Sequence, residues 1–123
     1  MTGRRPPSGT APRAVSAVLG SWGAALLTAP QRVVPATRRD RPVPRALVLR
    51  LLGARMVAQH ALLAARPTRA LVRAGVAVDL LHLASMVVLA LVSPEHRRLA
   101  TVSGATAAAS AALEAAVAPV AER

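Results

Sequence analysis

The sequence predicts an all-α protein, a four-helix transmembrane bundle. Apolar residues make up 54% of the 123-residue chain, and the mean hydropathy is +0.43. Soluble domains contain roughly 45–50% apolar residues even when glycine is counted. Long apolar segments alternate here with short basic turns that contain proline. Alanine and leucine outnumber β-branched residues, and no segment shows the two-residue alternation typical of a strand.

The elements follow in order from this alternation. Residues 1–13 are polar, basic and rich in proline, which predicts a disordered tail. Residues 14–121 form the single helical membrane domain. Basic turns that contain proline separate its apolar segments, because proline interrupts a helix. The expected helices span about 14–30, 46–65, 69–92 and 97–118.

The number of spans is left open between four and three. The uncharged segment 14–29 has 16 residues, slightly fewer than the roughly 17–25 that cross a bilayer. The alternative to four spans is three, with an N-terminal helix that lies in the interface or is a signal peptide cleaved at Val34-x-Ala36. Three spans place the N-terminus in the cytoplasm by the positive-inside rule, whereas with four spans the arginines are balanced. Either arrangement predicts a multi-pass protein of the cytoplasmic (inner) membrane.

A soluble four-helix bundle is the competing interpretation. Its helices should carry polar residues over about half of their surface. Residues 74–92 hold only Asp79, His82 and Ser85 as polar groups, and these form one narrow stripe. In water this helix would have to be enclosed by protein, and a chain of this length is too short to enclose it.

Ionisable side chains inside the expected spans form the candidate site. A charge at the bilayer centre costs about 2.5–3.5 kcal/mol on insertion scales, so these side chains should face one another. We add a glutamine that lies one turn from one of them on the same helix face. The resulting intramembrane polar cluster is Arg55, Gln59, Asp79, His82 and Glu114.

The positions of the turns predict which of these charges lie at the same depth. In an antiparallel hairpin centred near Pro67, Arg55 lies opposite Asp79. The next hairpin places Asp79 level with a residue about half a turn from Glu114. We therefore expect a buried salt bridge between Arg55 and Asp79, with Glu114 and His82 close by. The pair either neutralises two costly charges and fixes the helix register, or belongs to a proton or polar-solute path.

Other sequence features are less specific. His60 is expected at the membrane interface rather than as a metal ligand. Small residues four apart predict close helix packing. They are Ser16, Gly20 and Ala24 in the first helix, and Ser103, Ala107, Ala111 and Ala115, with Gly104, Ala108, Ala112 and Ala116, in the last.

Composition excludes several chemistries. The formal net charge is +11, and all 16 basic residues are arginine. Together with the absence of Lys, Asn, Ile, Phe and Tyr, this indicates a high-GC bacterial genome rather than phosphate recognition. The chain has no cysteine, so it offers no thiolate metal site and no cysteine nucleophile. No metal, no cofactor and no enzymatic activity are expected, since no phosphate loop, metal cluster or nucleophile–base pair is present.

Two runs resemble a known group of proteins. One is Leu51-Leu52-Gly53-Ala54-Arg55, and the other is Gly75-x-x-x-Asp79-x-x-His82-x-x-x-Met86. Together with Leu19-Gly20-x-Trp22-Gly23, they are similar to small uncharacterised actinobacterial membrane proteins and distantly similar to DoxX-like four-helix membrane proteins. The resemblance implies a four-helix arrangement and brings no established activity with it.

The sequence therefore favours a structural or accessory membrane protein with a buried Arg–Asp ion pair. Its expected partners are the lipid bilayer and either another membrane protein or a second copy of the chain. The alternative is a small transporter or proton-coupled component that uses Asp79, His82 and Glu114. Nucleic-acid binding is not expected, because the arginines lie mainly in turns and tails and no stacking aromatics accompany them.

Overall fold

The computed structural model describes residues 9–34 and 42–121, and every regular element in these ranges is a helix. This confirms the all-α prediction. Four helices are long and three are single turns. The elements are α1 (Thr10–Thr28), α2 (Pro30–Val33), α3 (Pro42–Ala65), α4 (Arg69–Val92), η1 (Pro94–His96), α5 (Arg97–Val117) and η2 (Ala118–Val120).

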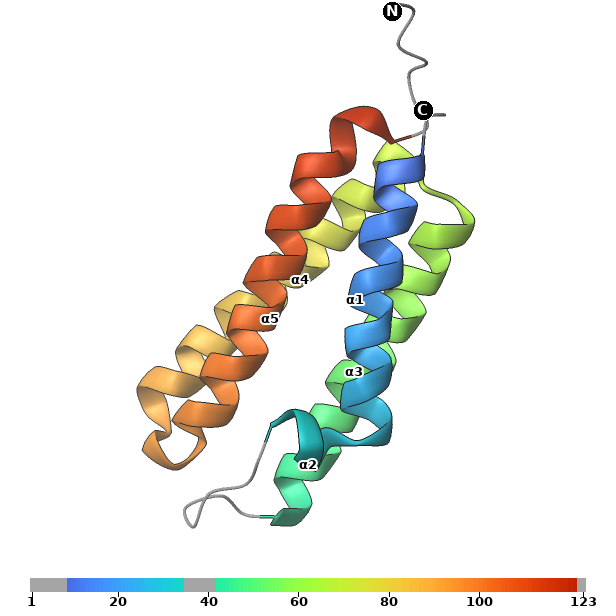
Figure 1. The fold of residues 1–123 in the computed structure, drawn as a ribbon. Helices are drawn as coiled ribbons and strands as arrows, with labels where there is room; N and C mark the ends of the chain where they lie inside the picture. Colours follow the sequence, from blue (N-terminus) through green and yellow to red (C-terminus); the bar gives the residue numbers. More distant parts are fainter. Residues whose placement is uncertain (1–8, 35–41, 122–123) are drawn as a thin grey trace, which may run out of the picture.

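The long helices run alternately in opposite directions and form two hairpins (Figure 1). α1 packs along α3, and α4 packs along α5, whereas contacts between the two pairs are few. The pairs meet at the end where α3 turns into α4. They diverge toward the end that carries α2 and η1 (Figure 1). The small set of contacts between the hairpins therefore decides how they are placed relative to each other.

Proline positions explain why two helices begin earlier than predicted. α1 starts at Thr10, inside the segment predicted to be a disordered tail, and α3 starts at Pro42 instead of residue 46. Pro12 and Pro44 lie in the first turns of these helices, where backbone N–H groups have no intrahelical acceptor and a proline removes no bond. Residues 1–8 of the predicted tail and Ala36 of the signal-cleavage site lie outside the described residues.

The predicted turns are present at Pro67 and Pro94. Thr68 caps α4, because its Oγ1 accepts a hydrogen bond from the backbone N of Leu71 at 3.3 Å. At the second turn, the Ser93 hydroxyl lies 2.8 Å from Nδ1 of His96 and does not cap a backbone N–H. The first helix ends sooner than predicted, at Thr28, and Pro30 starts the short α2.

The closest approach in the α1–α3 hairpin is between two glycines. A Cβ added to Gly53 would lie 2.5 Å from the carbonyl oxygen of Gly23 and 2.6 Å from the backbone N of Leu27. A Cβ added to Gly23 would lie 2.7 Å from the Cβ of Met56. The two backbones are therefore in direct contact, in the manner of small-residue helix pairs in membranes.

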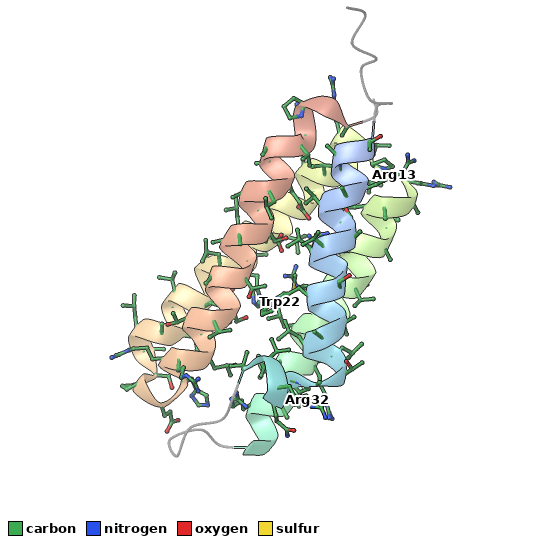
Figure 2. All side chains as sticks on the ribbon, in the orientation of Figure 1. Arg13, Trp22 and Arg32 are labelled. Carbon is green, nitrogen blue, oxygen red and sulfur yellow. The ribbon has the colours of Figure 1, made fainter. Side chains whose placement is uncertain are left out.

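The buried apolar side chains belong mainly to the α1–α3 hairpin. The largest cluster combines Leu19 and Leu26 of α1 with Leu49, Leu52 and Met56 of α3, and Leu99 at the start of α5 packs against it. Trp22 lies on the side of α1 that faces α5 (Figure 2) and is 39% exposed. The α4–α5 hairpin, by contrast, buries mostly small and polar residues.

Two helices are long and apolar enough to cross a membrane. They are residues Arg45–Ala65 of α3 and Arg69–Val92, which is all of α4. α1 and α5 do not reach the same hydropathy. The two apolar helices support association with a membrane.

We expect Gly53→Val to disrupt the α1–α3 contact. The added side chain would meet the backbone of α1, and overpacking of this kind costs about 1–3 kcal/mol. The free energy of unfolding can be measured in detergent micelles from the loss of helical circular dichroism. Ala54→Val, at an exposed position of the same helix, should cost only about 0.5 kcal/mol, the difference in helix propensity. Equal losses in the two variants would contradict the glycine contact.

Candidate functional site

Arg55 of α3 and Asp79 of α4 form an ion pair between the two hairpins. Both terminal nitrogens of Arg55, Nη1 and Nη2, donate to Oδ1 of Asp79 at 3.0 Å. Asp79 is 1% exposed, and the Arg55 side chain is 27% exposed. The structure thus brings together the two residues that turn counting places at equal depth.

Gln59 extends the ion pair into a larger network of Arg55, Gln59, His60, Asp79 and Glu114. It lies one turn after Arg55 on α3, and its side-chain oxygen accepts a hydrogen bond from Arg55 Nη1 at 2.9 Å. Its Nε2 donates to Oε1 of Glu114 at 3.0 Å and to Oδ2 of Asp79 at 3.4 Å. One amide therefore joins a side chain from each of α3, α4 and α5.

Glu114 brings α5 into the network. It is 1% exposed, although α5 has no acidic or basic neighbour for it along its own helix face. Oε1 lies 3.5 Å from Nδ1 of His60, which is also 1% exposed. Nε2 of His60 lies 3.4 Å from the hydroxyl of Ser110, one turn before Glu114 on α5. His60 is therefore buried inside the bundle, a position that the sequence analysis did not predict.

A glycine on α4 makes room for the glutamate. A Cβ added to Gly75 would lie 2.5 Å from Oε2 of Glu114 and 3.2 Å from Nε2 of Gln59. Gly75 is one turn before Asp79, so it lies on the same face of α4. Any larger residue at this position would push the Glu114 carboxyl group out of its place.

Three buried atoms in the network have no hydrogen-bond partner among the described residues. They are Nε of Arg55, Nδ1 of His60 and Oε2 of Glu114. A buried polar atom without a partner costs about 1–3 kcal/mol. Both carboxylate oxygens of Asp79 accept hydrogen bonds. By contrast, Oε2 of Glu114 and Nδ1 of His60 make no hydrogen bond to the described residues.

His82 lies outside the network. Its Nε2 is 2.7 Å from the hydroxyl of Ser103 on α5. That pair joins α4 to α5 within one hairpin, about one turn of α4 beyond Asp79. The sequence analysis expected His82 close to the ion pair, but its side chain contacts Ser103 instead.

Sequence reasoning missed His60, Gly75 and Ser110. Each of them is one residue or one turn away from a residue that was predicted: His60 follows Gln59, Gly75 precedes Asp79 by four, and Ser110 precedes Glu114 by four. The helical spacing of four is the signal that could have found the last two.

The arrangement can neutralise buried charge and bind a proton. Within the described residues, no group of three His, Cys, Asp or Glu side chains is placed to hold a metal ion. Comparisons with protein-family models, curated proteins and solved structures give no match to this chain. The geometry of the site is therefore the basis for assigning a function.

We expect removal of one ionic partner to cost more than removal of both. Arg55→Leu leaves the buried carboxylate of Asp79 without its cation, and breaking a buried pair in this way costs about 3–5 kcal/mol of unfolding free energy. The double variant Arg55→Leu with Asp79→Leu should be more stable than Arg55→Leu alone. Detergent-micelle unfolding measures all three proteins, with Arg50→Leu, at an exposed arginine of the same helix, as the control. A double variant less stable than either single variant would contradict the ion pair.

Proposed function

We propose that the chain is a multi-pass protein of the cytoplasmic membrane with a structural or accessory role. In this proposal its buried ionic network fixes the relative position of two helical hairpins. The lipid bilayer is the principal partner, and the exposed apolar faces are available to another membrane protein or a second copy.

The distribution of side chains on α4 is the observation that carries the proposal. The buried residues of this helix are Val72, Gly75 and Asp79. Many of its large apolar side chains are exposed, among them Leu81 at 71% and Leu91 at 75%. In water each such exposed side chain would lose the stabilisation of about 1.5–3 kcal/mol that its burial would provide. A helix that buries its aspartate and exposes several leucines matches a lipid environment better than an aqueous one.

The positions of the arginines support the same environment. Arg13 and Arg32 lie near the two ends of the α1–α2 segment, with Trp22 between them (Figure 2). Arg66 lies in the α3–α4 turn, and Arg97 lies at the start of α5 at the opposite end (Figure 1). Long basic side chains at helix ends reach the headgroup region.

Helix lengths allow all four long helices to cross. α1, the shortest, has 19 residues, and at 1.5 Å per residue it is about 28 Å long. That length is close to the roughly 30 Å of a hydrocarbon core. α1 also packs antiparallel along α3, which favours four spans over three spans with an interfacial first helix.

The network would hold the two hairpins in one relative position. An ion pair that is broken in lipid leaves charges in a medium of low dielectric, so separating the hairpins at this level is strongly unfavourable. Few other contacts join α3 to α4 or α5. Asp79, Gln59 and Glu114 would therefore help to define the register between two units that share few other contacts.

A small proton-coupled component or transporter is the second candidate. The observation that favours it is the unpartnered pair of atoms, Nδ1 of His60 and Oε2 of Glu114. Polar side chains follow the interface from Glu114 to the His82–Ser103 pair, over about 16 Å of α5 at 1.5 Å per residue. Titratable side chains of these types form the proton relays of membrane proteins.

Topology can be tested with single cysteines, because the native chain has none. We expect Arg66→Cys and Glu95→Cys to react with a membrane-impermeant maleimide from opposite sides of sealed vesicles. Ala11→Cys should react from the same side as Arg66→Cys if α1 crosses. Reaction of every cysteine after detergent lysis is the control. Labelling of Arg66→Cys and Glu95→Cys from one side, or release of the protein by alkaline carbonate, would overturn the membrane proposal.

Proton flux in liposomes separates the two candidate functions. The structural role predicts no flux above that of empty liposomes for the wild type or for Asp79→Asn. Flux in the wild type that is lost in Asp79→Asn but kept in Glu95→Gln, an exposed carboxylate in the η1 turn, would establish the second candidate instead.

A further inference from the structure

A cavity of about 310 Å³ lies between the start of α4 and the end of α5. These two helix ends lie at the same end of the bundle (Figure 1). The α4 wall of the cavity consists of two cationic residues, Arg69 and Arg73, and the opposite wall consists of Ala115, Ala118 and Pro119. Ligand pockets measure roughly 300–1,000 Å³, so the cavity is large enough for a small anionic headgroup.

The two arginines have hydrogen-bond donors to spare. They are four residues apart, so their side chains are neighbours on one face of α4. Nη2 of Arg69 donates to the carbonyl oxygen of Pro119 at 3.0 Å, which holds this guanidinium against the opposite wall. A guanidinium has several N–H donors, so one such bond leaves most of them available. The carboxylates of the described residues form their ion pairs elsewhere, and none of them pairs with Arg69 or Arg73. The cavity therefore presents uncompensated positive charge to an anion.

The helix faces that continue from the cavity along the bundle are apolar. On α4, the turns after Arg73 carry Ala77 and Leu80 on the same face, and Leu80 is 51% exposed. On α5, Ala112 lies about one turn before Ala115 and is exposed. Because α4 packs along α5, the two helices share a surface that is cationic at its end and apolar along its length. An amphiphile with an anionic headgroup matches both parts.

We propose that this cavity binds the phosphate group of an anionic phospholipid. Arg69 and Arg73 donate hydrogen bonds to the phosphate oxygens, and the acyl chains lie along the apolar faces of α4 and α5. Basic pockets between membrane helices bind anionic headgroups in this way. The depth is suitable, because Arg73 lies only about 6 Å along α4 from Arg69 and a long arginine side chain reaches the headgroup region. A zwitterionic lipid fits less well, because its ammonium group brings a second positive charge toward the arginines.

This inference rests on the proposed membrane location and names the lipid class, and the two can fail separately. The full chain is placed in nanodiscs that hold equal amounts of dioleoyl phosphatidylglycerol and dioleoyl phosphatidylcholine. Native mass spectrometry then counts the lipids that stay bound to the released protein. The two lipids share their phosphate and acyl chains and differ in the net charge of the headgroup. Glycerol phosphate, added in excess, supplies the phosphate without the acyl chains.

We expect one phosphatidylglycerol to stay bound per chain in preference to phosphatidylcholine, and glycerol phosphate not to displace it. Arg73→Gln should reduce this retention about fivefold, the contribution of one arginine near an anionic membrane surface. Arg66→Gln removes an exposed arginine at the same end of the bundle that does not line the cavity, and it should leave retention unchanged. Ala115→Leu fills the cavity without changing its charge and should also reduce retention. Ala116→Leu, at the exposed neighbouring position outside the cavity, is its matched control.

Equal losses in Arg73→Gln and Arg66→Gln would overturn the proposal, because the lipid would then be attracted by the basic surface as a whole. Equal retention of the two lipids by the wild type would overturn it as well. Displacement of the lipid by glycerol phosphate would assign the cavity to a soluble phosphate compound instead. The two alanine variants decide the question even if Arg73→Gln does not fold. Absence of a lipid preference in a protein whose cysteine labelling shows that α4 crosses the bilayer would remove this inference and leave the membrane assignment in place.

Discussion

The structure depends on one buried contact, the Arg55–Asp79 ion pair with Gln59 beside it. α1 with α3, and α4 with α5, each pack along their length, but few contacts join the two hairpins. At the level of the ion pair, side chains of α3, α4 and α5 meet through direct hydrogen bonds. Because unpaired charges are costly in a medium of low dielectric, this contact has a strong preference for one register.

Depth along the bundle could be predicted from the sequence, and rotation about the helix axes could not. A helix rises 1.5 Å per residue, so counting from the Pro67 turn was sufficient to place Arg55 opposite Asp79. Each residue also turns about 100° around the axis, and the direction of a side chain depends on which neighbour lies beside it. That is why His82, which was expected close to the charges, meets Ser103 instead. It is also why the buried position of His60 was missed.

The packing within the hairpins was likewise only partly predictable from the sequence. Of the small residues predicted in the first helix, Ser16 is buried and Gly20 lies against His60 of α3, whereas Ala24 is exposed. The tightest glycine contact in this hairpin is instead between Gly23 and Gly53. A repeat of small residues predicts that helices can approach closely, while the partner helix decides which stripe is used. The divergence of the hairpins (Figure 1) has no local signal, because it depends on contacts between residues that are far apart in the chain.

The network draws its side chains from three successive long helices, and this has a consequence for biosynthesis. A ribosome completes α3 before α4 and α4 before α5, so the guanidinium of Arg55 is made before its aspartate, and Gln59 before Glu114. Until the last helix emerges, the nascent protein holds polar groups whose partners do not yet exist. A chain interrupted after α4 would contain the ion pair but lack Glu114, and it would expose the α4 face that α5 covers. In such an intermediate, an insertion chaperone would have to cover the unpaired polar groups and the exposed face of α4.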